Sequence, residues 1–178
     1  MIAYQNAQLF EEVQRHAATD QLTGLANRRH FLEQAERAVK SHAATDLPLS
    51  AAMMDIDYFK RVNDAYGHSV GDEVLAEIAR RIRSSLRGEE ILGRIGGEEF
   101  AVLMSVPAST ATALAERLRA AVAHRPVNTS IGPLDIRLSI GLAHLAPHDT
   151  DLRDLLDRAD QALYTAKRGG RDQVAVHH

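Results

Sequence analysis

The sequence contains no cysteine, which excludes a disulfide framework and any cysteine-based zinc or thiol site. It also lacks a long apolar run: the longest nearly apolar stretch, residues 47–54, includes a proline and a serine and is far shorter than the roughly 20 residues that cross a bilayer. The first residues lack the basic start and apolar core of a secretory signal. We therefore expect a cytoplasmic location and no membrane span in this segment.

Charge of one sign is not in excess either, since 21 basic and 24 acidic residues give a formal net charge of −3. This near balance disfavours a protein that wraps nucleic acid by bulk electrostatics, so we expect no nucleic-acid partner, although a local basic patch can still hold a phosphate. With 178 residues, 45% of them hydrophobic and 25% charged, the chain is long enough for one compact domain and a short additional segment.

The additional segment is the N-terminus. Residues 1–18 have a helical pattern, with side chains spaced 4, 3, 4 and 3 apart at Ile2, Asn6, Leu9, Val13 and His16. This spacing is typical of one seam of a coiled coil, but two heptads also fit an amphipathic helix that lies on its own domain. The pattern leaves both alternatives open.

Hydrophobic periodicity predicts the order of the remaining elements. After a helix over 27–41 we expect strand, helix, strand, strand, helix, strand and helix, with a candidate last strand over 173–176. Their expected bounds are 47–55, 70–86, 90–95, 98–104, 110–123, 135–143 and 152–167. The Gly96-Gly97 pair between the two middle strands is a strong hairpin signal. This order predicts an α+β fold of the ferredoxin-like kind, with a largely antiparallel sheet and helices on one face or on both.

Acidic residues gather at two predicted strand ends. Asp55 and Asp57 are two residues apart at the end of the first strand, where a β conformation puts both carboxylates on one side. Such hard oxygen ligands suit Mg²⁺, although a solvated strand end with helix-capping aspartates fits the pair equally well. Glu98 and Glu99 follow the glycine turn on opposite faces, so only one of them can join Asp55 if the hairpin lies beside the first strand. The alternative is an ordinary hairpin with solubilising acids.

Other polar side chains have both a structural and a functional interpretation. Asn63 and Asp72 lie in a loop and helix start that is dense in hydrogen-bonding groups, where caps and turn residues are common. Lys167 and Arg171 lie near the end of the last helix. They either complement the helix dipole or bind phosphate.

Taken together, these segments resemble the GGDEF domain family of diguanylate cyclases. The resemblance covers about residues 19–176 and rests on seven segments in order: DQLTGLANRR at 20–29, DIDYFK at 55–60 with ND at 63–64, GH at 67–68 with GD at 71–72, GGEEF at 96–100, SIG at 139–141, RAD at 158–160, and Lys167 with GR at 170–171. Joint matches of this kind are far rarer than single ones. The GGEEF signature is a variant associated with active members.

The resemblance implies an enzyme that condenses two GTP molecules into cyclic di-GMP and two pyrophosphates. It implies that Mg²⁺, or alternatively Mn²⁺, is held by Asp55, the backbone carbonyl of Ile56 and Glu98, and that Glu98 also matches the residue proposed as general base. It further implies backbone N–H groups of Tyr58, Phe59 and Lys60 on the β- and γ-phosphates, with help from Lys167 and Arg171. Asn63 and Asp72 would bind the guanine base.

The resemblance also implies a homodimer, because one domain holds one GTP and the chemistry needs two of them face to face. Residues 1–18 then resemble the signalling helix that joins an upstream sensor, absent from this chain, to a cyclase domain over 19–178. A candidate inhibitory site for the product carries over to Arg87, Glu90 and Arg117. Glu90 stands where the family pattern has an aspartate, so an ordinary surface pair of Arg87 and Glu90 is the alternative there.

Two rival functions remain in different classes. One is a catalytically silent module that binds GTP or cyclic di-GMP and signals through contacts. The other is a mononucleotide cyclase, because related cyclase catalytic domains share this architecture. The intact polar set at positions 55, 63, 72, 98 and 167 argues against the first, and the GGEEF hairpin argues against the second.

Overall fold

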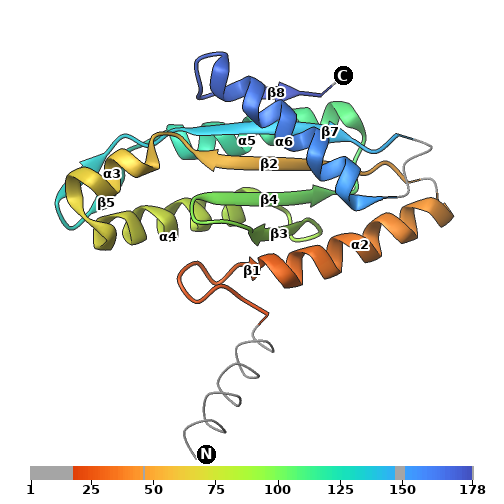
Figure 1. Cartoon of the computed structure of the whole chain (residues 1–178), viewed down its shortest axis with the longest axis horizontal. Helices are drawn as coiled ribbons and strands as arrows, with labels where there is room; N and C mark the ends of the chain where they lie inside the picture. Colours follow the sequence, from red (N-terminus) through yellow and green to blue (C-terminus); the bar gives the residue numbers. More distant parts are fainter. Residues whose placement is uncertain (1–17, 46, 147–150, 178) are drawn as a thin grey trace, which may run out of the picture.

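A computed structural model describes residues 18–45, 47–146 and 151–177. Its main sheet has six strands in the order β1-β3-β4-β2-β7-β8, antiparallel in the centre and parallel at the two outer pairs (Figure 1). A separate antiparallel hairpin is formed by β5 and β6. The strands are β1 (Ala26–Asn27), β2 (Ser50–Ile56), β3 (Ile91–Arg94), β4 (Glu99–Met104), β5 (Val127–Thr129), β6 (Gly132–Leu134), β7 (Leu138–His144) and β8 (Val174–Val176).

Helices cover both faces of the sheet (Figure 1). Alternation along β2 sends Ala52 and Met54 to a core beneath α4 and α5, and Ala51 and Met53 to a core beneath α2 and α6. Every residue of β2 is buried. The described helices are α2 (Arg28–Thr45), α3 (Phe59–Tyr66), α4 (His68–Ser85), α5 (Ala108–Ala123) and α6 (Leu152–Arg168).

The predicted ferredoxin-like fold is confirmed. Its βαββαβ unit is β2, α4, β3, β4, α5 and β7, in which β2 and β4 lie side by side at the centre. The predicted antiparallel hairpin is present as β3 and β4. None of the described helices is long and apolar enough to cross a membrane. The predicted helix over 1–18 lies almost entirely outside the described residues.

Two local predictions were wrong, and three short strands were missed. The segment after Asp57 was expected to be a loop, but residues 59–66 form the separate helix α3. The first strand begins at Ser50 rather than 47, since Pro48 has no N–H to donate to a strand ladder. The short strands β1, β5 and β6 were not predicted, because two or three residues carry no periodic signal.

The last helix lies directly on the sheet at Gly141. A Cβ at this position would overlap the backbone nitrogen of Leu163 and the carbonyl oxygen of Ala159, both in α6. Only glycine therefore allows the α6 backbone to approach β7 so closely. This contact fixes the helix that carries Lys167 against the strand next to β2.

A buried arginine ties α4 to the end of α5. Arg81 is 6% exposed, and its guanidinium donates to the carbonyl oxygens of Val122 at 2.8 Å, Arg125 at 2.6 Å and Pro126 at 2.8 Å, and to the carboxylate of Glu77 at 2.8 Å. The cation thus satisfies carbonyls that the end of α5 leaves without helical partners. It holds the chain in place as it enters the β5–β6 hairpin.

Candidate active site

The acidic residues meet at one end of the sheet. Asp55 is the penultimate residue of β2, and its register partners are Glu99 on β4 and Ser139 on β7. The carbonyl oxygen of Glu98 accepts a hydrogen bond from the N–H of Ile56 at 3.3 Å. The hairpin therefore lies beside the first strand, which is the condition under which the sequence predicted an acidic cluster.

Lys167 supplies the positive charge in this cluster. Its Nζ lies 2.9 Å from Oδ2 of Asp55, whose side chain is only 9% exposed. Burial raises the pKa of Asp55, and the ion pair with Lys167 opposes that rise. Burial and the neighbouring charge of Asp55 also raise the pKa of Glu98. The charge of Lys167 therefore does not fully compensate the negative charges of the two carboxylates.

This donor set fits a divalent cation that also binds phosphate. Among the described residues, no group of three or more histidine, aspartate or glutamate side chains forms a complete metal cage. Mg²⁺ needs no such cage, because it typically takes one or two carboxylates and completes its shell with water and substrate phosphates. The carboxylates of Asp55 and Glu98, whose raised pKa values report unfavourable negative charge, suit this mode of binding.

The predicted phosphate-binding residues lie at the start of α3. Tyr58 precedes the helix in a left-handed conformation with φ of 57°, and no side chain caps the helix there. The side chain of Arg171, from the turn after α6, lies against Tyr58: Nη1 is 3.3 Å from the tyrosine hydroxyl, and the guanidinium is 4.5 Å from the ring centroid. The uncapped helix start and Arg171, which are far apart in sequence, thus lie together.

The predicted pair of aspartates has two different roles. Asp57 lies beyond the last residue of β2 and is buried. Its Oδ1 accepts the hydroxyl of Ser139 at 2.7 Å and its Oδ2 accepts the N–H of Asp172 at 3.0 Å. Both oxygens of Asp57 are thus engaged by the protein, whereas Asp55 pairs with Lys167, so the two carboxylates have different partners. Sequence reasoning missed Asp57, Ser139 and Asp172 as a connected group, because the partners of Asp57 are 82 and 115 residues away.

The two predicted base-binding residues lie on α3 and α4, which pack against each other (Figure 1). The side-chain oxygen of Asn63 is buried and has no hydrogen-bond partner. Gly71 packs directly against it, and a Cβ there would overlap this oxygen. Asp72 is exposed within α4, whose N-cap residue is Gly67. The helix-cap interpretation of Asn63 and Asp72 is therefore wrong, since the two residues lie inside α3 and α4 rather than at their caps.

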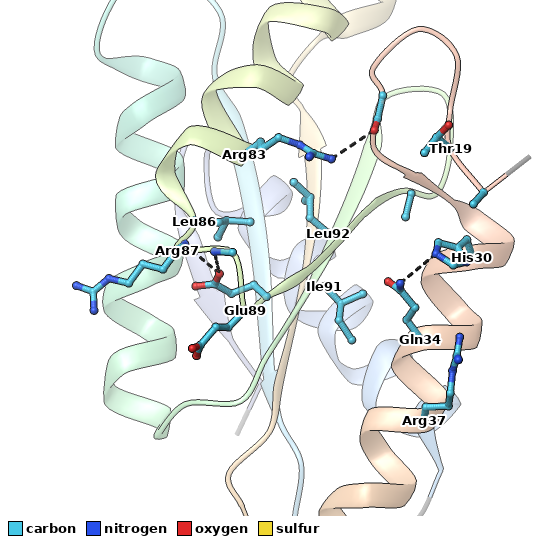
Figure 2. A pocket seen from close by; sticks show the side chains of 15 residues that line it. Thr19, His30, Gln34, Arg37, Arg83, Leu86, Arg87, Glu89, Ile91 and Leu92 are labelled. Carbon is cyan, nitrogen blue, oxygen red and sulfur yellow. Dashed lines mark hydrogen bonds between the residues drawn. The ribbon is translucent and has the colours of Figure 1, made fainter.

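Two residues of the candidate inhibitory site, Arg87 and Glu90, line a hollow of about 790 Å³ at the end of α4 (Figure 2). Oε2 of Glu90 accepts hydrogen bonds from the backbone N–H groups of Arg87 and Gly88, both at 3.0 Å. The carboxylate therefore stabilises the turn over residues 87–90. The Arg87 side chain points outward, away from α2 (Figure 2). Arg117 donates to the carbonyl of Ser85 at 2.8 Å. The alternative of an ordinary Arg87–Glu90 surface pair does not describe this arrangement.

Comparison with known proteins identifies a family. The family model described as "Diguanylate cyclase, GGDEF domain" matches residues 17–173. Response regulator PleD of Caulobacter vibrioides is 43% identical over 161 residues, which are 89% of this chain and 36% of PleD. Diguanylate cyclase DgcP of Pseudomonas aeruginosa is 43% identical over 169 residues, which are 93% of this chain and 25% of DgcP. The chain therefore spans between a quarter and two fifths of the length of these two relatives.

Solved structures agree with these relatives. The coiled coil and GGDEF domain of DgcB from Caulobacter crescentus in complex with c-di-GMP has a TM-score of 0.86 and 33% identity, covering 98% of this chain and 93% of that one. The active GGEEF domain of a diguanylate cyclase from Vibrio cholerae has a TM-score of 0.81 and 37% identity, covering 86% of this chain and 98% of that one. At these identities the likeness extends beyond the fold.

The raised pKa of Glu98 leads to a prediction about stability. A carboxyl group whose folded pKa lies above its ordinary value contributes stability below that ordinary value, and the contribution is lost as the pH rises through the raised pKa. We therefore expect Glu98→Gln, without metal or nucleotide, to unfold at a temperature equal to or above that of the unmodified chain near neutral pH. The difference should vanish below about pH 4, where glutamate is protonated.

Thermal unfolding in the presence of a chelator, over a series of pH values, measures this difference. Glu89→Gln, at an exposed position on the preceding turn, is the matched control and should show no such pH-dependent gain. A Glu98→Gln variant that is less stable than the unmodified chain near neutral pH would contradict the prediction.

Proposed function

Because this chain belongs to the GGDEF domain family of diguanylate cyclases, we propose that it condenses two GTP molecules into cyclic di-GMP with release of two pyrophosphates. The observation that carries the proposal is the meeting of Asp55, Glu98 and Lys167 at the end of β2, with Arg171 beside the uncapped start of α3. The two carboxylates can bind a metal ion, and the side chains of Lys167 and Arg171 can bind the phosphates of a nucleotide.

We assign the metal ligands to Asp55, the backbone carbonyl of Ile56 and Glu98, with Mg²⁺ as the cofactor and Mn²⁺ as an alternative. When bound, the metal would neutralise the triphosphate and stabilise the charge that develops at the α-phosphate. Glu98 is in the first place a ligand, since a bound cation holds its pKa low and makes it a poor proton acceptor. In the absence of nucleotide, Lys167 provides part of this neutralisation through its ion pair with Asp55.

We assign the phosphates to the start of α3, and the guanine base to side chains on α3 and α4. The backbone N–H groups of residues 58–60 would face the β- and γ-phosphates, with the side chains of Lys167 and Arg171. Asn63 and Asp72 would bind the guanine edge, which presents two N–H donors to a carboxylate. The placement of the two residues on α3 and α4, which pack against each other, supports this assignment.

Catalysis requires a second copy of this chain. One domain provides one set of these groups and so binds one GTP, whereas the product joins two nucleotides, each of whose 3′-hydroxyl groups attacks the other's α-phosphate. We therefore propose a homodimer that places two such sites face to face about a two-fold axis. The upstream sensor and the cytoplasmic location stay predictions from the sequence.

Chromatography of the products after incubation with GTP and Mg²⁺ tests the activity. We expect cyclic di-GMP from the unmodified chain and less than about a tenth of that turnover from Glu98→Gln, a loss of at least roughly 1.4 kcal/mol of transition-state stabilisation. A mononucleotide product would identify the rival cyclase, and GTP binding without turnover at any protein concentration would identify the silent module. Glu98→Gln that retains more than about a tenth of the unmodified turnover would overturn the assigned role of Glu98.

The base assignment predicts a change in nucleotide preference. Asp72→Ser removes the carboxylate that accepts from guanine, so the preference for GTP over ATP should fall by about tenfold or more. A competition assay with both nucleotides measures the ratio. Asp64→Ser, at an exposed position on α3, is the matched control and should leave the ratio unchanged. The same ratio in Asp72→Ser and Asp64→Ser would contradict the assignment.

The Arg87 site predicts weak product inhibition. Cyclic di-GMP would bind the Arg87 guanidinium, and Arg117 would assist, but the Glu90 carboxylate already holds two backbone N–H groups. We expect Glu90→Asp, which restores the shorter acid, to lower the product concentration that halves the rate, and Arg87→Ala to abolish inhibition. Arg80→Ala, which removes an exposed arginine of α4, is the control. Tight calorimetric binding of cyclic di-GMP that survives Arg87→Ala would place the inhibitory site elsewhere.

A further inference from the structure

The turn that carries Arg171 has an unusual backbone. Three consecutive residues are left-handed, with φ of 117° at Gly170, 64° at Arg171 and 45° at Asp172. Glycine adopts this conformation freely, but Arg171 and Asp172 do so at a cost in free energy. Such a conformation persists only where surrounding contacts determine it. The contacts that hold this turn therefore decide where the Arg171 side chain lies.

The Arg171 N–H donates to the carbonyl oxygen of Ala166 in α6 at 3.0 Å, and contacts of Asp172 hold the rest of the turn. From the end of β2, Oδ2 of Asp57 accepts the N–H of Asp172 at 3.0 Å, and the hydroxyl of Ser139 on β7 fixes the other carboxylate oxygen at 2.7 Å. In addition, the Asp172 carboxylate pairs with Arg119 of α5 at 2.7 Å and with Arg137 at 3.5 Å. Asp57 is 6% exposed, so its hydrogen bonds are shielded from competing water.

Asp57 also adjoins the other half of the phosphate-binding region. The next residue, Tyr58, is itself left-handed with φ of 57° and begins α3. Two guanidinium groups lie over the Tyr58 ring, that of Arg61 at 4.3 Å and that of Arg171 at 4.5 Å from its centroid. Asp57 thus joins the backbone before α3 to the turn after α6, and the Tyr58–Arg171 contact lies across that junction.

We propose that Asp57 is a positioning residue for GTP, which sets the Arg171 guanidinium against the start of α3 without touching the nucleotide. This inference rests on the proposed function only for the identity of the ligand. The carboxylate acts as an acceptor of two hydrogen bonds rather than as a charge for the metal, since both of its oxygens are engaged by Ser139 and Asp172. Loss of Asp57 releases the turn, and Arg171 leaves the Tyr58 ring.

A measurement without nucleotide tests the positioning directly. Because Arg171 lies over the Tyr58 ring, its side-chain resonances are shifted by the ring current, and Arg171→Ala identifies them in NMR spectra of the full chain. Asp57→Ala should abolish this shift. Asp57→Asn should keep it, because the amide oxygen can accept the Asp172 N–H while the Ser139 hydroxyl reverses its role and accepts from the amide nitrogen. A shift that persists in a folded Asp57→Ala variant overturns the proposal.

A double-mutant cycle on GTP binding tests the consequence. We expect Asp57→Ala and Arg171→Ala each to weaken binding of GTP with Mg²⁺ about tenfold, and the double variant to be no weaker than either. Asp57→Asn should bind within about twofold of the unmodified chain. Losses that add to about a hundredfold, or an Asp57→Asn variant as weak as Asp57→Ala, would overturn the proposal. Failure of the unmodified chain to bind GTP would overturn the proposed function instead, and the NMR result would still decide the positioning role.

Discussion

The register of β2 between β4 and β7 is the constraint on which the site depends. Side chains alternate along β2, so its apolar residues fill one core beneath α4 and α5 and another beneath α2 and α6. A slip of one residue would exchange the two faces and send Asp55 into the apolar core beneath α4 and α5. Hydrophobic packing therefore holds Asp55 opposite Glu99 and Ser139, although the charge of Asp55 raises the pKa of nearby Glu98.

The sequence predicted what local patterns encode. The long helices, the Gly96-Gly97 hairpin and the central strand have periodic or turn signals within a few residues, and the structure confirms them. The β5–β6 hairpin has no such local signal, because its turn is held by a residue far away in sequence. The N–H and the hydroxyl of Ser130 each donate to the carboxylate of Glu73 on α4 at 2.7 Å. Likewise the motifs predicted Asp55 and Glu98, but nothing near Asp57 in sequence indicates its bonds to Ser139 and Asp172. Contacts between segments that are distant in sequence could not be predicted from local patterns.

The negative charges of Asp55 and Glu98 are not fully neutralised by the protein's own cations. The pKa values of Asp55 and Glu98 are raised in the protein alone, and Lys167 opposes both rises without cancelling them. Asn63 in addition holds a buried oxygen without a donor. A cation bound to the two carboxylates would offset the unfavourable negative charge, which is the basis on which we proposed a metal there.

The close contact of α6 with β7 at Gly141 has a consequence for the design and comparison of such chains. This glycine lies two residues from Ser139 and within a recognisable sequence motif, so it is easily mistaken for part of the nucleotide site. Its requirement is steric, because any side chain there would collide with the main chain of α6. A library that diversifies substrate preference should leave this position fixed, and a glycine found there in another chain reports how a helix docks rather than which reaction follows.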